Sequence, residues 1–388
     1  MISSLRPLIT HKFFPIFILF IISLLFFYPI IFGGNVFFFG DTLLNRVPSM
    51  VYWKHQLSLG QLPLWNPYVF AGLPHLADLS SNTLSPFNII YLLVDNPFIA
   101  LSLLTVLEIF LSSILVYYYL INFTSVTPAL FGAIVWAYSG TTLAATNDIN
   151  TLQGIILIPA VILAAHHLCT RPRIVTIINL SLVLLLQFIS GHPQYSYYTW
   201  IFTCFYLFVF LQLSIKYKLR IIFTVFIFFL GLSSVQLLPF IELSGLTYRP
   251  QDLQFSNQNS LSPIDLPSFV VADVYGSWRT GSSWGPNSPL ETGRANTEGY
   301  VGVIPLGLTL IALVKVKSRH AHFFLATAIV SLILAFGSLT PLFTLARQFL
   351  PLFNKFRSPI RITAFYTLGL SYVSALGLNH LISKHDHS

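Results

Sequence analysis

Charged residues are scarce in this chain, and their scarcity sets the class of protein. Only 8% of the 388 residues are Asp, Glu, Lys or Arg, whereas a soluble globular domain carries about 25%. Hydrophobic residues make up 55% of the chain, including 36 Phe and 18 Tyr. The composition therefore excludes an ordinary soluble domain and predicts an integral membrane protein.

Cysteine is also scarce, and the histidines form no metal-binding motif. The two cysteines, Cys169 and Cys204, lie in apolar surroundings and belong to no CxxC pattern. The 11 histidines include no HExxH sequence and no clustered set. We therefore expect neither a disulfide framework nor a zinc site.

Long apolar segments account for most of the remaining sequence. Ten of them can span a bilayer: 13–32, 97–121, 128–146, 151–169, 174–190, 195–214, 221–240, 300–314, 321–340 and 360–382. No small-residue cleavage site follows the first segment, so we expect a retained first helix. The expected fold is an all-α polytopic membrane protein, with residues 1–388 forming one transmembrane domain of about ten helices.

The basic residues give the orientation. The short loops on the side of the termini hold Arg6, Lys12, Arg171, Arg173, Lys216, Lys218, Arg220, Lys315, Lys317, Arg319 and Lys384. The positive-inside rule therefore predicts a multi-pass protein of the cell inner (plasma) membrane with both termini in the cytoplasm. The net charge of +8 is then an orientation signal, and we expect no nucleic-acid partner.

Two long loops are predicted on the outer face. The first covers residues 33–96 and is rich in aromatic side chains, so we expect partial helices lying on the membrane surface. The second covers residues 242–299 and is rich in Ser, Asn, Gly and Pro. Loops of this length are usually functional or disordered. Nearly all of the 12 acidic residues fall at or beyond the outer face, which indicates that the chemistry is there.

Five short motifs are predicted to lie along the outer face. They are GDTLLNRVP from Gly40, GQLPLWNPYVFAGLP from Gly60, YSG from Tyr138, SGHPQY from Ser190 and FRSPIR from Phe356. Together they resemble the YfhO family of bacterial membrane proteins, over about Asp41 to Gly377. That family is related to the GT-C glycosyltransferases, which use polyprenyl-phosphate-linked sugars. Its members are usually much longer, with further spans and a C-terminal outer-face domain.

The resemblance implies an active site in the outer loops. GT-C enzymes place an acidic residue of the first outer loop at the active site, and Asp41 matches it. A carboxylate suits removal of the acceptor's hydroxyl proton, and Asp148 would assist it or bind a divalent cation. Arginines suit bidentate contact with a departing phosphate. The predicted substrate-binding residues are His192, Gln194, Arg249, Glu298, Arg357 and Arg361.

Each of these residues also has a structural interpretation. Asp41 can be a helix N-cap, because a Leu-rich stretch follows it. Asp148 can belong to a simple turn, and Arg357 and Arg361 can contact lipid headgroups. His192 can be a polar residue of the interface.

Three other residues also have an ordinary explanation. Trp65 and Tyr68 are typical interfacial anchors. Glu108 lies within a span, where structural hydrogen bonding to a Tyr or Ser of a neighbouring span competes with a functional role.

The sequence therefore favours one function and leaves two others open. The favoured function is transfer of a sugar from a polyprenyl-phosphate donor to a cell-envelope glycan or glycolipid on the outer face. The partners would be that lipid-linked sugar, the acceptor and membrane lipid. The alternatives are a flippase or transporter of lipid-linked glycans, for which Glu108 is the one indication, and a non-catalytic scaffold. No cofactor is implied with certainty; a divalent cation stays open.

Overall fold

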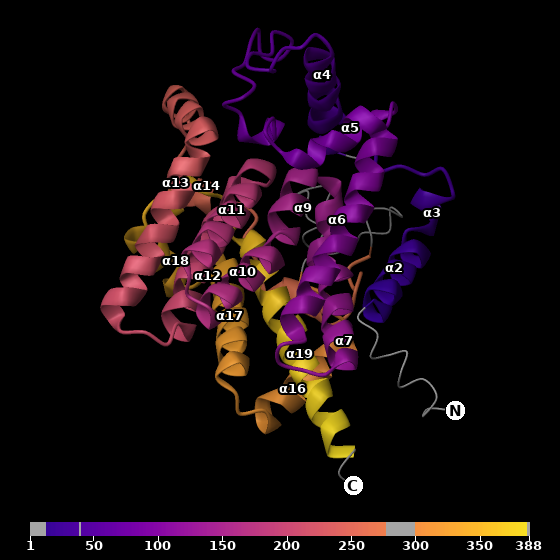
Figure 1. The fold of residues 1–388 in the computed structure, drawn as a ribbon, viewed down its shortest axis with the longest axis vertical. Coiled ribbons are helices and arrows are strands. Elements are labelled where there is room, and N and C mark those ends of the chain that lie inside the picture. The colour runs from indigo at the N-terminus through magenta and orange to yellow at the C-terminus, as the bar shows by residue number, and fades with distance from the viewer. Residues whose placement is uncertain (1–12, 39, 277–298, 386–388) are drawn as a thin grey trace. The chain divides into compact units, whose positions relative to one another are not determined.

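The fold is known from a computed structural model that describes residues 13–38, 40–276 and 299–385. Over these ranges the chain is helical, and its only β-type pairing is one isolated bridge between Asn66 and Leu73. A helix occupies each of the ten predicted apolar segments (Figure 1). The prediction of an all-α protein is thus confirmed.

Twelve of the described helices account for most of the apolar segments. They are α2 (Phe14–Phe26), α3 (Tyr28–Ile31), α6 (Pro97–Leu120), α7 (Val126–Ala137), α9 (Ile149–Ile156), α10 (Ile158–Thr170), α11 (Ile174–Ser190), α12 (Pro193–Phe210), α13 (Ile215–Leu246), α16 (Val303–Lys315), α17 (Arg319–Ala335) and α19 (Thr363–His385). Shorter turns of helix connect them: η1 (Thr42–Arg46), α4 (Val47–Ser58), η2 (Leu79–Ser81), η3 (Pro86–Ile89), α5 (Ile90–Leu93), α8 (Gly140–Ala144), η4 (Ala145–Asn147), α14 (Leu253–Ser256), η5 (Pro263–Phe269), η7 (Gly337–Leu339), α18 (Pro341–Phe349), η8 (Phe353–Lys355) and η9 (Pro359–Ile362).

Among the described residues, four helical stretches are long and apolar enough to cross a membrane. They are Pro97–Leu120, Val126–Asn147, Ile149–Thr170 and Ile215–Leu246. The first has 24 residues, which corresponds to about 36 Å at 1.5 Å per residue, against about 30 Å for the hydrocarbon core. Shorter apolar helices occupy Phe14–Phe26, Ile174–Ser190, Val303–Lys315 and Arg319–Ala335. These lengths and compositions fit a membrane protein.

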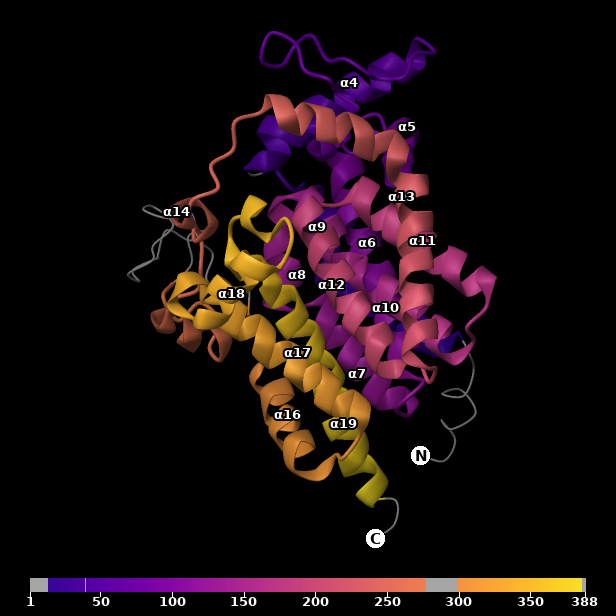
Figure 2. The same cartoon turned by 90° about the vertical axis from the view of Figure 1, so that its left-hand side faces the viewer.

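The chain forms two compact units. Unit 1 comprises Met1–Leu19, Val116–Ala144 and Arg249–Ser388, and unit 2 comprises Phe20–Leu115 and Ala145–Tyr248. In unit 1, α7, α16 and α17 contact α19 (Figure 2). Gly377 allows the closest approach: a Cβ there would lie 2.1 Å from the Leu308 carbonyl oxygen of α16. Small residues at such positions are a recurring means of joining membrane helices.

Unit 2 is built on helices α9 to α13, with α11 in contact with α9, α10, α12 and α13. The predicted first outer loop lies at one end of these helices and contains η1, α4, η2, η3 and α5 (Figure 1). Its aromatic residues fix it in place; the Trp53 indole donates a 3.0 Å hydrogen bond to the Thr83 carbonyl. The loop is therefore an ordered part of unit 2, and it positions the residues described next.

Candidate functional site

Asp41 and Asp148 come together in unit 2. Asp41 directly precedes η1 and is exposed. The hydroxyl of Thr42, the next residue, donates a 3.2 Å hydrogen bond to the carbonyl of Asn147, the residue before Asp148. The fold therefore brings the segments of two acids that are 107 positions apart in the sequence to one end of unit 2. A site in which Asp148 assists Asp41 needs the two segments to be neighbours.

The acids at this end differ in how their carboxylates are used. Asp148 caps α9, accepting from the Asn150 backbone N–H at 3.0 Å and the Thr151 hydroxyl at 2.7 Å. Asp78 likewise caps η2 through the Ser80 backbone N–H at 3.0 Å. Asp41 accepts no side-chain cap bond, and its carboxylate has no hydrogen-bonded or ionic partner within the described ranges. Asp41 thus differs from Asp78 and Asp148 in having a carboxylate that is available to a substrate.

His192 lies beside the start of α9. Its backbone N–H donates to the Asn150 carbonyl at 2.9 Å, and its ring Nδ1 accepts from the Gln194 N–H at 3.2 Å, which caps α12. The approach is close because Gly191 has no side chain; a Cβ there would lie 2.6 Å from the Gly154 Cα. The structure therefore joins His192 to the segment that carries Asp148. Gln194 is instead buried and donates to the Tyr198 hydroxyl at 2.9 Å.

A chain of buried polar side chains runs inward from the first loop. The Arg46 guanidinium donates to Asn88 Oδ1 at 2.8 Å, and Asn88 Nδ2 donates to the Asn82 carbonyl at 2.7 Å. The Asn82 amide donates to Gln153 Oε1 at 2.9 Å, and the Gln153 amide donates to Glu108 Oε1 at 2.6 Å. All five residues are no more than 3% exposed. We call this set the buried polar chain.

The buried polar chain connects a cation to a carboxylate through three amides. A buried polar or charged group is costly to desolvate unless it is hydrogen-bonded, and each member of the chain is hydrogen-bonded to the next. Sequence reasoning considered Glu108 but expected a Tyr or Ser partner; the partner is the amide of Gln153. It did not single out Arg46, Asn82, Asn88 or Gln153.

Burial in the first loop also shifts two pKa values. His75 is 2% exposed; burial lowers its pKa, and the charge of Asp78 only partly offsets this while Arg46 adds to it. Burial raises the pKa of Tyr91, an effect opposed by the Arg46 guanidinium, which lies 5.8 Å from the ring centroid.

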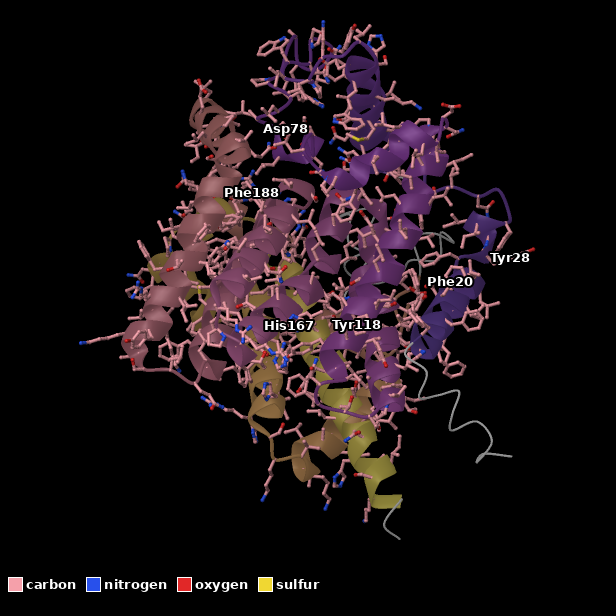
Figure 3. All side chains as sticks on the ribbon, in the orientation of Figure 1. Phe20, Tyr28, Asp78, Tyr118, His167 and Phe188 are labelled. Atoms are coloured by element: carbon pink, nitrogen blue, oxygen red, sulfur yellow. The ribbon has the colours of Figure 1, made fainter. Side chains whose placement is uncertain are left out.

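Asp78 lies at the loop end of unit 2, whereas His167 lies towards the other end (Figure 3).

The three arginines that were predicted to bind phosphate lie close together in unit 1. Arg249 and Arg357 lie over the same ring, Phe255, at 5.2 and 5.9 Å from its centroid. The Arg249 Nε donates to the Lys355 carbonyl at 3.0 Å. Partial burial lowers the pKa of Arg249, and the positive charges of Arg357 and Arg361 lower it further. We call Arg249, Arg357 and Arg361 the arginine cluster.

Two segments of unit 1 lie against each other and bring the residues of the arginine cluster together. Residues 249–262 lie against the segment that leads into α19, where the Asn259 carbonyl accepts from the Ile360 N–H at 3.4 Å. Arg347 of α18 joins the same region and donates to the Ser256 hydroxyl at 3.2 Å. Sequence reasoning did not single out Arg347. The remaining predicted substrate residue, Glu298, lies outside the described residues.

The side chains give no evidence of a metal centre in the part of the chain that the structure describes. No group of three or more His, Cys, Asp or Glu residues there could hold a metal ion. The acid pair of unit 2 therefore has no third side-chain ligand of these types among the described residues.

Comparisons with protein-family models, with curated proteins and with solved structures find no match to this chain. What the structure itself defines is an all-helical protein with apolar helices of membrane-spanning length. The resemblance to the YfhO family and to GT-C enzymes remains a prediction from the sequence motifs.

Proposed function

We propose that this protein is a polytopic GT-C-type glycosyltransferase with about ten spans. It transfers a sugar from a polyprenyl-phosphate donor to a cell-envelope glycan or glycolipid on the outer face. The observation that carries the proposal is the state of Asp41. Its exposed carboxylate stands beside the Asp148 segment without a cap bond, while Asp78 and Asp148 are used as helix caps.

The reaction needs only the donor and the acceptor. The acceptor hydroxyl oxygen attacks the anomeric carbon and forms the new C–O bond, while Asp41 takes the hydroxyl proton. The bond between the anomeric carbon and the phosphate oxygen breaks, and its electron pair leaves with the polyprenyl phosphate. No oxidant, reductant or further co-reactant is required.

The arginine cluster receives the phosphate role in this proposal. The positive charges of Arg357 and Arg361 lower the pKa of Arg249, so a bound anion would stabilise the cluster, and arginine forms bidentate contacts with phosphate. Phe255 holds two of the guanidinium groups over its faces, which limits their freedom before the anion binds. His192 is assigned to the acceptor side, because it lies in unit 2 with Asp41.

The experiment is a transfer assay with purified full-length protein in vesicles. Polyprenyl-phosphate donors carrying different radiolabelled sugars are offered with envelope glycan and glycolipid acceptors. We expect label in the acceptor with one donor, and a loss of about 100-fold or more in Asp41→Asn, since a general base contributes at least this factor. Asp78→Asn, a cap in the same loop, is the matched control and should retain transfer. Full transfer by Asp41→Asn would refute the mechanism.

The buried polar chain favours a second candidate function, a flippase for lipid-linked glycans. Ionisable residues within membrane helices often mark transport paths, and Glu108 is completely buried in α6. Labelled donor in vesicles without acceptor distinguishes the two. Movement of donor between leaflets that Glu108→Gln abolishes and Asp41→Asn leaves intact would support the flippase and exclude the transferase.

A further inference from the structure

A pocket of about 360 Å³ opens in unit 1, separate from the residues discussed so far. Its size falls within the range of about 300–1,000 Å³ typical of ligand pockets. The pocket is lined by Phe123, Lys315, Val316, Lys317, Ser318, His320, Tyr372, Leu376, Asn379, His380 and Ser383. These residues come from the end of α16, the start of α17, the C-terminal half of α19 and the α6–α7 connection. The positive-inside pattern predicts that all four segments face the cytoplasm.

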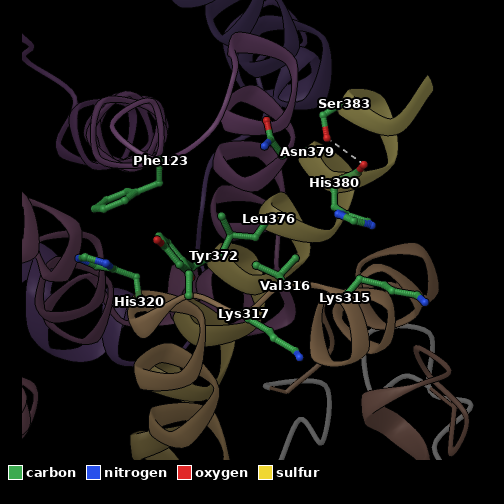
Figure 4. A pocket seen from close by; sticks show the side chains of 11 residues that line it. Phe123, Lys315, Val316, Lys317, His320, Tyr372, Leu376, Asn379, His380 and Ser383 are labelled. Carbon is green, nitrogen blue, oxygen red and sulfur yellow. Dashed lines mark hydrogen bonds between the residues drawn. The ribbon is translucent and has the colours of Figure 1, made fainter. Parts of the chain in front are cut away.

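The lining combines positive charge with an aromatic side. Lys315 and Lys317 bring the positive charge, and among the described residues no acidic side chain lines the pocket. Phe123, His320 and Tyr372 lie along one side, and Lys315 and His380 along the other (Figure 4). The ring centroids of Phe123 and His320 are 4.4 Å apart, and those of Phe123 and Tyr372 are 5.6 Å apart. Such a lining fits an anionic group joined to an apolar portion.

The start of α17 adds to the positive potential. Ser318 is the N-cap of this 17-residue helix, and its hydroxyl accepts from the Ala321 N–H at 3.0 Å. A helix N-terminus carries a partial positive charge and normally attracts acidic side chains. The first turn of α17 holds no acid and instead begins with Arg319 and His320. An anion in the pocket would offset this unfavourable accumulation of like charge.

The positive-inside rule alone does not explain where the basic residues of the pocket lie. Lys315 lies in the last turn of α16, where a cation stabilises the helix end. Lys317 follows that helix, is exposed, and lines the pocket. The positive-inside rule requires its charge on this side but does not require it beside Asn379, Ser383 and the start of α17.

We propose that this pocket binds a phosphate-bearing anion, from either an anionic phospholipid headgroup or a soluble phosphate ester. Lys317 and the first turn of α17 contact the phosphate. Phe123 and Leu376 contact the apolar portion, and Asn379 hydrogen-bonds the polar remainder. The site is independent of the proposed glycosyl transfer and lies at the predicted cytoplasmic face.

Titration of purified full-length protein in a non-ionic detergent tests the proposal. The probes are dioctanoyl phosphatidylglycerol, dioctanoyl phosphatidylcholine and glycerol 3-phosphate, with the dissociation constant and the thermal midpoint as readouts. We expect phosphatidylglycerol to bind more tightly than phosphatidylcholine and to raise the midpoint. Lys317→Ala should weaken binding about tenfold, the value of one hydrogen bond to a charged group, and Lys317→Arg should restore much of it.

Lys216→Ala is the matched control. Lys216 is an exposed cation predicted on the same side, but it belongs to unit 2 and is not among the residues that line the pocket. Its replacement should leave binding unchanged. Lys317-dependent binding of glycerol 3-phosphate as tight as that of the lipid supports the site and identifies a soluble ligand; weaker binding identifies the lipid. Equal binding by wild type and Lys317→Ala, equal weakening by Lys216→Ala, or no preference over phosphatidylcholine overturns the proposal.

Discussion

At the scale of single residues, the buried polar chain is the feature with the largest expected energetic effect. Arg46 and Glu108 are both almost fully buried, and three amides link them. Removing one member of such a set leaves its neighbours buried without a hydrogen-bond partner. The resulting loss of stability is larger than the net stability that the intact set provides. These residues therefore define the local structure around the candidate site.

We expect Arg46→Met to lower the free energy of unfolding by about 1–3 kcal/mol for each of the two buried acceptors that it leaves unpaired, the Ser81 carbonyl and Asn88 Oδ1. Glu108→Gln should cost less, because it keeps the shape and one hydrogen bond. Lys54→Met is the control: Lys54 forms a 3.2 Å ion pair with the exposed Asp95, and such surface pairs contribute about 0–1 kcal/mol. Thermal unfolding in detergent measures all three; equal effects of Arg46→Met and Lys54→Met would contradict this description.

His75 gives a pH dependence whose sign follows from burial. Burial lowers its pKa below the ordinary 6.5, so the folded state favours the neutral ring. Between the two pKa values the unfolded state binds more protons, and stability therefore falls as the pH drops below about 6.5 and levels off below the folded-state pKa. His75→Phe should reduce the loss of thermal stability between pH 7 and pH 5. His55→Gln, at an exposed histidine of the same loop, should leave that loss unchanged.

The sequence predicted the outer-loop residues better than the buried ones. Asp41, Asp148 and His192 were recognisable because polar residues next to apolar segments are few, and the structure joins their segments in unit 2. Arg46 was not recognisable, because a single basic residue in a loop gives no sign that it is 3% exposed. Its partners, the Ser81 carbonyl and Asn88 Oδ1, are 35 and 42 positions away, and only tertiary contacts select them.

At the scale of helices, close packing in unit 1 depends on α19. Gly377 contacts the Leu308 backbone of α16 so closely that a side chain would displace the helix, whereas Gly307 of α16 has open space around its Cβ position. Apolar periodicity could predict both helices but not which glycine faces a neighbour. The contrast between these two glycines provides a matched pair of substitutions.

We expect Gly377→Ala to destabilise the protein by about 1–3 kcal/mol, the usual cost of overpacking. Gly307→Ala should be neutral or should stabilise by up to about 1 kcal/mol, because alanine has the higher helix propensity. Thermal unfolding of the two variants in one detergent is the measurement. A neutral Gly377→Ala would show that α16 and α19 do not approach as closely as the structure indicates.

At the scale of the whole molecule, composition alone was sufficient for the fold class. A chain with 8% charged residues and ten apolar segments must satisfy its backbone within helices in a bilayer, and the described residues are helical in every one of those segments. The division into two units was not predictable, because each unit combines segments that are distant in sequence.

The most direct test of the proposed activity is the release of polyprenyl phosphate from a labelled sugar donor by purified protein, with thermal stability measured on the same samples. The account predicts that Asp41→Asn lowers the rate by about 100-fold or more while its thermal midpoint stays at the wild-type value, because the Asp41 carboxylate makes no cap bond. Asp148→Ala should instead lower the midpoint, since Asp148 caps α9 and alanine cannot accept the Asn150 N–H. Release at the wild-type rate by Asp41→Asn would contradict the account.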